Sequence, residues 1–385
     1  MIKLPEGADI LSLPGTIALG MDCKDDEVQS IILELHGNER DALPVGAILP
    51  PGYLRTFLPA CDADDNFRKA LPLFSYTALA SSEEGLYAAA IKIDDPEKWN
   101  PLKFNGPELK ELVEKKNREL PDNRIIEQLA KCSLEYHCCT AQNIFYGRWE
   151  GGIPVSPYCN ARCLGCISLQ PAECCPSPQS RIKEVPTAKE VIELAVSHLD
   201  TAEEAIISFG QGCEGEPSLQ ANLLQESIRE IRRQTNKGTI NINTNAGSTE
   251  NIQSICEAGL DSMRVSLISA RNSSYESYYR PIGYTLEDVK NSLVLARDYG
   301  VYRSINLLVF PGFTDREEEV DALFEFISHV DLDMVQLRNL NIDPELFLDV
   351  MDEPLGKIHG IKEFVDKLRS TFPDVAIGAY SKPVR

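Results

Sequence analysis

The chain of 385 residues contains no run of about 18 consecutive apolar residues, the length that a membrane-spanning helix requires. Its first residues, MIKLPEGADILSLPGTIALGM, lack the uninterrupted apolar core found in signal peptides. Basic residues are scarce relative to acidic ones: the chain has 38 Lys and Arg but 59 Asp and Glu. The resulting net charge of −21 repels phosphate backbones and anionic membranes. We therefore expect a cytoplasmic protein without a membrane segment, for which nucleic acid is a poor partner.

Cysteine, in contrast, is abundant. In a chain of this length without an export signal, the 12 cysteines indicate free thiols, metal sites or redox chemistry rather than disulfides. The length exceeds that of one ordinary domain, and no low-complexity tract or exact repeat interrupts the sequence. We expect one large domain and a smaller one.

The domain organisation is predicted from local patterns. Residues 1–105 contain short apolar runs broken by Pro and Gly, such as GLYAAAIKI, and predict an accessory, mostly β domain. Residues 106–150 predict a helical connector, because charged and apolar positions recur at helical spacing with an interruption near Pro121. Residues 151–385 predict an α/β domain that ends in one helix and a short strand.

From residue 151 onward, apolar strand-like runs alternate with amphipathic helical stretches. The six strand candidates are GIPVSPY, EAIISFG, TININTN, SMRVSLIS, YRSINLLVF and DMVQLRN. Three capping boxes predict helix starts: Thr187 with Glu190, Thr285 with Asp288, and Thr314 with Glu317. Three glycines just before the next strand predict helix ends: Gly238, Gly259 and Gly300. Such repeated units predict a parallel sheet, and six of them can curl into an open barrel whose site lies at the carboxyl ends of the strands.

Three cysteines lie close together in SPYCNARCLGC, at Cys159, Cys163 and Cys166, in the loop that follows the first predicted strand. Three thiolates suffice for a four-iron four-sulfur cluster whose fourth iron binds something other than protein, whereas a closed structural site normally has four protein ligands. This Cys-x3-Cys-x2-Cys pattern, at this place in the strand order, resembles the radical S-adenosylmethionine (radical SAM) superfamily over about residues 151–340.

The resemblance implies an open partial (β/α)6 barrel of radical SAM type. It also implies an enzyme that cleaves S-adenosylmethionine reductively at the cluster, giving a 5′-deoxyadenosyl radical that abstracts hydrogen from a substrate. A flavodoxin or ferredoxin would donate the electron. The residue before the third cysteine is commonly aromatic in the family, but here it is Gly165, which implies a different wall around the adenine.

The resemblance also carries cofactor roles onto this chain. The segment GEP, which includes Gly215 and Glu216, is similar to the motif that holds the cofactor amino group, and Arg280 in YYRP is similar to the arginine that meets the methionine carboxylate. The full set of cofactor-binding candidates is Gly215, Glu216, Thr244, Asn245, Ser266, Ser269 and Arg280. On the sixth predicted strand, Gln336 and Arg338 alternate with apolar neighbours and are candidates for the substrate side.

Two alternatives remain at this stage. Gly210, Gly212 and Gly215 also satisfy the dinucleotide fingerprint of an oxidoreductase, although that fingerprint belongs to a first strand and opens directly into a helix. The second alternative is a scaffold protein, in which the three clustered cysteines and either Cys174 or Cys175 bind a structural zinc ion.

Six of the remaining nine cysteines, which lie near the cysteine loop in sequence or at the active end of a strand, are candidates for a second iron–sulfur cluster: Cys132, Cys138, Cys139, Cys174, Cys175 and Cys213. Cys213 lies inside the predicted cofactor loop, where its thiol could also donate a hydrogen atom to a substrate radical, so it is the candidate catalytic residue. Packing in the core is an equally good explanation for this cysteine. The substrate is not indicated by any motif.

Overall fold

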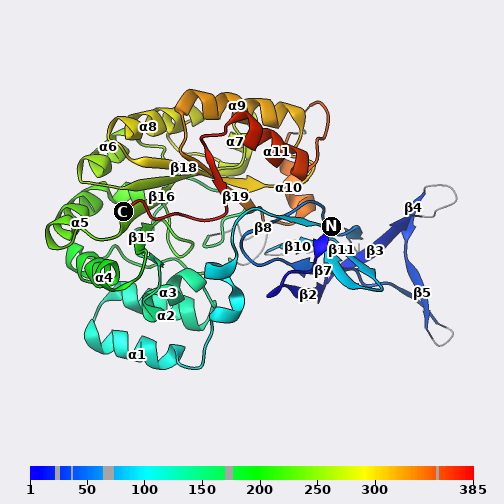
Figure 1. The fold of residues 1–385 in the computed structure, drawn as a ribbon, viewed down its shortest axis with the longest axis horizontal. Coiled ribbons are helices and arrows are strands. Elements are labelled where there is room, and N and C mark those ends of the chain that lie inside the picture. Colours follow the sequence, from blue (N-terminus) through cyan, green and yellow to red (C-terminus); the bar gives the residue numbers. More distant parts are fainter. Residues whose placement is uncertain (22–26, 36–37, 64–72, 170–176, 353–354) are drawn as a thin grey trace.

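The structure is a computed structural model that describes residues 1–385 except 22–26, 36–37, 64–72, 170–176 and 353–354. It comprises an N-terminal region of small antiparallel sheets, a group of three helices, and a curved parallel sheet whose outer face is covered by helices (Figure 1). In the figure, the strands β4 (Val28–Ser30) and β5 (Ile32–Leu35) extend far from the rest of the molecule.

The parallel sheet has seven strands in sequential order, each paired in parallel with the next. These are β14 (Glu150–Gly152), β15 (Ile206–Phe209), β16 (Thr239–Thr244), β17 (Ser262–Leu267), β18 (Tyr302–Val309), β19 (Met334–Asn339) and β20 (Ala376–Gly378). The predicted open barrel is confirmed, and the short strand expected in the tail adds a seventh strand to its edge.

Helices connect the strands and cover the outside of the sheet (Figure 1). They are α4 (Ala188–Thr201), α5 (Ala221–Gln234), α6 (Thr249–Glu257), α7 (Asn272–Tyr279), α8 (Leu286–Asp298), α9 (Glu317–Val330), α10 (Pro344–Val350) and α11 (Ile361–Thr371), with the 3₁₀ turn η3 (Pro217–Gln220) before α5. Their apolar faces and the sheet share one continuous hydrophobic core, which is the main source of stability for such a fold.

Local signals placed most helix ends correctly. Thr187 and Thr285 form capping boxes with Glu190 and Asp288, and the three glycines predicted at helix ends have positive φ. The predicted capping box at Thr314 is wrong, because its hydroxyl accepts the Phe310 N–H at 2.9 Å and closes a turn, and α9 begins later. The first strand is also misplaced in the prediction, since β14 ends at Gly152 and shares only that residue with GIPVSPY.

The described residues of the N-terminal region form thirteen short strands. They pair in the orders β1-β12-β11, β10-β7-β2, β4-β3-β9, β13-β8 and β5-β6. Besides β4 and β5, these strands are β1 (Ile2–Lys3), β2 (Asp9–Ser12), β3 (Thr16–Met21), β6 (Asn38–Asp41), β7 (Val45–Ile48), β8 (Tyr53–Arg55), β9 (Cys61–Ala63), β10 (Tyr76–Thr77), β11 (Leu79–Ser82), β12 (Gly85–Ala88) and β13 (Ala90–Lys92). The 3₁₀ turns η1 (Glu97–Trp99) and η2 (Pro101–Lys103) follow them.

Strand β8 attaches the N-terminal region to the barrel at the end of β19. The side-chain amide of Asn339 accepts the Arg55 N–H at 2.9 Å and donates to the Tyr53 carbonyl at 3.0 Å. The Arg55 side chain is fully buried and donates to the Phe74 carbonyl and to the Leu340 carbonyl. Burial lowers the pKa of Arg55 to about 10.

Three helices join the two parts: α1 (Leu109–Glu119), α2 (Arg124–Leu134) and α3 (Cys139–Tyr146). The interruption predicted near Pro121 separates α1 from α2, and the Asn123 side chain caps α2. Helix α3 also lies within residues 106–150, the predicted helical connector. In the described part of the chain, no helix has the length and apolarity needed to cross a membrane.

Candidate functional site

Two loops meet at the carboxyl end of the sheet, one after β14 and one after β15. The Gly215 N–H donates to the Ser156 carbonyl at 2.6 Å, and the Glu216 N–H donates to the Tyr158 carbonyl at 2.7 Å. A Cβ atom at Gly215 would lie 2.0 Å from the Tyr158 carbonyl oxygen. Glycine is therefore required here, because any side chain would push the two loops apart.

Glu216 connects this pair of loops to the end of β16. Its carboxylate accepts hydrogen bonds from the Thr244 hydroxyl at 2.5 Å, the Asn245 N–H at 2.8 Å and the Ser218 N–H at 3.0 Å. Burial raises the pKa of Glu216, and the hydroxyl and amide donors act in the opposite direction. The carboxylate is thus fixed in place by groups from two strand ends.

The loop that carries the cysteines is also held from its other side. The Asn245 side chain donates to the Asn160 side chain at 2.7 Å. The Arg162 and Leu164 N–H groups donate to carbonyls at the end of α7, at 2.9 and 2.8 Å, and the Asn160 carbonyl accepts the Ile282 N–H at 2.8 Å. These bonds fix the backbone of the cysteine loop between β16 and α7.

The three predicted ligand cysteines lie together on this loop. Burial, and then the nearby Glu216, raise the pKa of Cys159 to about 11, and burial also raises the pKa of Cys163. The pKa of Cys166 falls below its ordinary value despite burial, because Ser168 donates hydrogen bonds to it and the Arg181 guanidinium lies 3.5 Å from its sulfur. Within the described residues, no three His, Cys, Asp or Glu side chains are arranged as ligands of one metal ion.

The space beside Gly165 explains the missing aromatic residue of the motif. A Cβ atom at Gly165 would lie 2.8 Å from the hydroxyl oxygen of Tyr278, a buried residue of α7. The Tyr278 ring therefore borders the position where the family commonly has an aromatic side chain. Its neighbour Tyr279 is also buried, with a ring-centroid distance of 4.9 Å between them.

The other predicted cofactor residues occupy different surroundings. Ser266 lies near the end of β17 and is partly accessible. Ser269 is buried, and its hydroxyl accepts the Arg271 N–H at 2.9 Å. Arg280 follows α7 with a φ of 46° and is exposed, so the structure does not bring it together with Glu216.

Cys213 faces the connector helices. Its thiol is hydrogen-bonded to the thiol of Cys132 in α2, and both residues are buried. This hydrogen bond lowers the pKa of Cys132 and raises that of Cys213. Cys138 lies close enough to act electrostatically on Cys213, and Cys132 acts in the same way on Cys138. Cys174 and Cys175 lie outside the described residues.

Glu214 and Arg181 are two site residues that were missed from the sequence. The buried Glu214 carboxylate accepts the N–H groups of Val155, Ser156, Gly210 and Gln211, at 2.6 to 3.2 Å. Burial raises the pKa of Glu214 to about 8 against the effect of these four donors. No sequence signal singles out Glu214 from Glu216, and Arg181 lies far along the chain from the cysteine that it contacts.

The glycines of this loop do not open a helix, as a dinucleotide fingerprint requires. Residues after Gly215 continue into Glu216, then η3, and α5 begins at Ala221. The pyrophosphate-binding arrangement of a helix N-terminus directly after the glycines is therefore not formed here.

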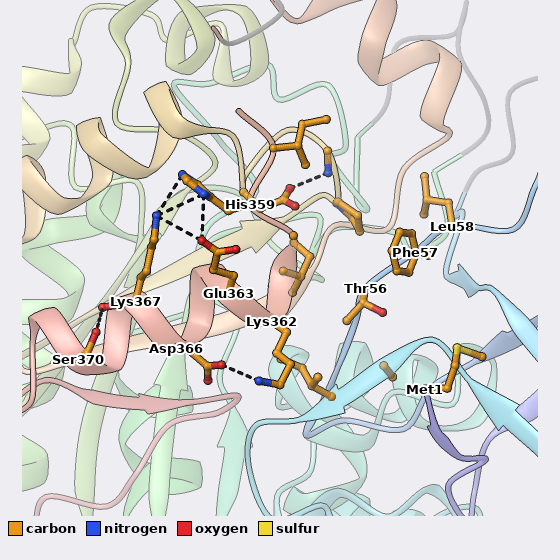
Figure 2. Close-up of a pocket in the computed structure, with 18 residues that line it drawn as sticks. Met1, Thr56, Phe57, Leu58, His359, Lys362, Glu363, Asp366, Lys367 and Ser370 are labelled. Atoms are coloured by element: carbon orange, nitrogen blue, oxygen red, sulfur yellow. Dashed lines mark hydrogen bonds and ion pairs between the residues drawn. The ribbon is translucent and has the colours of Figure 1, made fainter. Parts of the chain in front are cut away.

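A separate cavity of about 1240 Å³ lies between α11, the N-terminal region and the loop after β18. Figure 2 shows Phe57 and Leu58 on one side of this cavity and the side chains of α11 on the other. Its lysines are already paired within the helix: Lys362 bonds to Asp366 at 2.7 Å, and Lys367 lies 3.6 Å from Glu363.

Comparison with known proteins identifies the class. Residues 153–327 match the family model described as the Radical SAM superfamily. The match covers the cysteine loop, the Glu216 loop and the strand ends that carry Thr244 and Asn245. Residues 153–327, which carry this site, therefore match the radical SAM superfamily. No curated protein sequence matches the chain.

Several solved structures resemble the fold. HydG, a maturase of the FeFe-hydrogenase, is 15% identical over 72% of this chain and 63% of its own, with a TM-score of 0.43. Methylornithine synthase (PylB) is 14% identical over 72% of each chain, with a TM-score of 0.42. SuiB from Streptococcus suis, bound to the precursor peptide SuiA, is 14% identical over 82% of this chain and 73% of its own, with a TM-score of 0.43. The chain thus spans less than two thirds of HydG, and these likenesses do not extend to substrate or partners.

Proposed function

We propose that this protein binds a four-iron four-sulfur cluster through Cys159, Cys163 and Cys166 and abstracts hydrogen from a substrate held inside the barrel. The observation that carries the proposal is the junction of the cysteine loop with the Gly215–Glu216 segment through two short backbone hydrogen bonds. This junction puts three thiols next to a fixed carboxylate at the carboxyl ends of neighbouring strands, where sites of such sheets lie.

The residues at this place fit the proposed cofactors. Three thiols from one loop match a cluster that leaves one iron for a ligand other than protein. Burial raises the pKa of Tyr275, and the nearby Cys163 and Glu216 add to the shift, so this ring lies close to both groups. In the described part of the chain, the buried hydroxyl of Tyr279 has no hydrogen-bond partner, and a polar ligand would satisfy it.

When bound, the cluster supplies the electron for cleavage of S-adenosylmethionine to methionine and a 5′-deoxyadenosyl radical. In our proposal Glu216 holds the cofactor amino group, and Gly215 lets the cofactor loop approach the cysteine loop. Thr244 and Asn245 orient Glu216 and also contact the cofactor. Ser266 and Ser269, from the next strand, contact the cofactor. Arg280 would have to turn inward to meet the methionine carboxylate. The external electron donor would be a flavodoxin or ferredoxin.

The site is tested by metal content and cofactor cleavage in anaerobically purified protein. Wild-type protein should contain about four irons per chain and form 5′-deoxyadenosine when reduced in the presence of S-adenosylmethionine. Cys163→Ala should lose both, whereas Cys256→Ala, which removes a buried thiol from α6 away from the loop, should retain both. Colourless protein with one zinc ion per chain would instead support the scaffold alternative.

A further inference from the structure

The interior of the barrel is polar rather than apolar. Alternate residues of adjacent strands face inward and bond to one another: Asn241 of β16 donates to Ser208 of β15 at 3.0 Å, and Ser262 of β17 donates to Asn241 at 2.9 Å. The Gln336 side chain of β19 accepts from Arg264 of β17 at 3.2 Å. A barrel that holds no ligand in its interior is normally packed there with branched apolar side chains. The polar interior of this barrel is therefore suited to hold a polar molecule.

The charges in this interior do not balance. Arg264 donates to the Ser381 hydroxyl at 3.1 Å, and Ser381 lies 3.5 Å from the Glu150 carboxylate, so a serine connects this arginine to the buried acid. Glu150 also accepts the Ser208 hydroxyl at 2.8 Å. Arg264 and Glu150 therefore compensate each other, and a second arginine, Arg338, remains.

Arg338 is near acidic groups but is bonded to none of them. Burial, and then the nearby Arg264, lower its pKa to about 10, although the more weakly acting Glu150 and Asp94 oppose this shift. Within the described residues, its guanidinium makes no ion pair. The nearby Asp94 is already paired with Lys382 at 2.9 Å. Placing a charged guanidinium in such an environment is unfavourable unless an anion joins it.

The accessible part of the interior lies toward the carboxyl ends of the strands and includes Arg338. Ser208, Asn241, Arg264 and Gln336 are buried, whereas Ser266, Asn306, Leu308 and Arg338, which lie closer to the carboxyl ends of their strands, remain partly accessible. Ser266 is paired in register with Asn306, and Leu308 with Arg338.

The strands that line the interior also carry unsatisfied polar atoms. Among the described residues, the Asn306 Oδ1 acceptor and the Asn243 Nδ2 donor are buried without a hydrogen-bond partner. Natural structures rarely leave buried polar atoms unpaired, and a bound molecule commonly supplies the partner. In the cavity of Figure 2, by contrast, both lysines have carboxylate partners.

We propose that Arg338 binds an anionic oxygen group of the substrate, a carboxylate or a phosphate, inside the barrel, with Asn243 and Asn306 bonding to the adjacent polar part of the same molecule. This inference rests on the proposed function for the statement that the bound anion is the substrate. A planar guanidinium suits either oxyanion because it offers two parallel donors. The cysteine loop follows β14 and Arg338 lies on β19, so in this proposal the cofactor and the substrate anion are bound by residues of different strands.

The test uses sodium acetate and inorganic phosphate as separate probes of the reconstituted protein, at constant ionic strength and in the presence of S-adenosylmethionine. Titration calorimetry measures the affinity for each probe, and the probe that binds more tightly identifies carboxylate or phosphate as the preferred group. Arg338→Gln should weaken binding of that probe by about tenfold or more, since a charge-assisted hydrogen bond is lost. Arg338→Lys should lie between the two. Arg229→Gln, on the exposed face of α5, is the control with the same charge change and should bind as wild type does.

Stability gives an independent readout. Because Arg338 has no partner, Arg338→Gln should unfold at the same or a higher denaturant concentration than wild type. Arg264→Gln should unfold earlier, because it loses its bonds to Gln336 and Ser381. A structural role for Arg338 would make Arg338→Gln less stable and would contradict the proposal.

Three other results would overturn the proposal. These are equal affinity of wild type and Arg338→Gln for both probes, absence of saturable binding of either probe by wild type, and weaker binding of S-adenosylmethionine by Arg338→Gln. The last result would assign Arg338 to the cofactor carboxylate. Wild type that binds a probe through Arg338 but forms no 5′-deoxyadenosine would reject the proposed function and the substrate role, and would leave an anion site at Arg338.

Discussion

The junction between the cysteine loop and the cofactor loop makes Gly215→Ala an informative perturbation. The added Cβ would lie 2.0 Å from the Tyr158 carbonyl oxygen and 3.2 Å from the Cys159 nitrogen, and both are backbone atoms that no rotamer change can move away. The loops would have to separate by about 1 Å to relieve the contact. That movement would stretch the bonds from Gly215 to Ser156 and from Glu216 to Tyr158.

The expected cost follows from these contacts. Overpacking and two weakened buried hydrogen bonds should lower the free energy of unfolding by about 2 to 4 kcal/mol. A displacement of about 1 Å between Glu216 and the cysteines should also lower the rate of 5′-deoxyadenosine formation by about a hundredfold. Urea unfolding measures the first effect, and a single-turnover cleavage assay measures the second.

Gly212→Ala is the matched control in the same loop. Its Cβ would meet the ends of two flexible side chains, Ile167 at 2.4 Å and Gln179 at 2.9 Å, which can turn away. The cost should therefore stay below about 1.5 kcal/mol, with little change in cleavage. Gly215→Ala protein with the unfolding midpoint and cleavage rate of wild type would refute the role that we give to this junction.

Two further predictions concern Cys213 and Glu190. Cys213→Ala should keep the iron content and cofactor cleavage of wild type if the thiol only packs against Cys132, whereas loss of iron would reveal a second cluster, and loss of product alone would reveal a hydrogen donor. The Arg124 guanidinium, through its bonds to Glu190, holds the pKa of that carboxyl below its usual value, so the stability it provides is present above about pH 4.3 and is lost as the pH falls. In Glu190→Gln protein this acid-dependent part of the unfolding free energy should disappear, and an unchanged pH profile would contradict the assignment.

Much of the barrel could be predicted because its signals are local. The capping boxes at Thr187 and Thr285 depend on residues three positions apart, and the spacing of the three cysteines is a property of one short loop. The family match to residues 153–327 agrees with that spacing. The domain boundaries near residues 105 and 150 and the individual cofactor roles stay predictions.

The first strand shows where local signals fail. Residues Ile153–Ser156 are buried and apolar enough to predict a strand, but the Val155 and Ser156 N–H groups donate to the Glu214 carboxylate rather than to a neighbouring strand. A hydrogen bond between residues about 60 positions apart has no counterpart in hydrophobic periodicity. Periodicity also gives no sign that Tyr278 of α7 occupies the space beside Gly165, because the two residues are more than 100 positions apart.

The sequence alone determined the alternation of strands and helices and the three thiols at one strand end, because hydrophobic periodicity and ligand spacing act over a few residues. Only the tertiary structure decided which charges remain without a partner. Arg264 and Arg338 look equivalent in the sequence, but the tail brings Ser381 between Arg264 and Glu150, while the Asp94 carboxylate near Arg338 is paired with Lys382. Charge compensation depends on distances between segments that are remote in the chain, and these distances exist only once the barrel has closed around its interior.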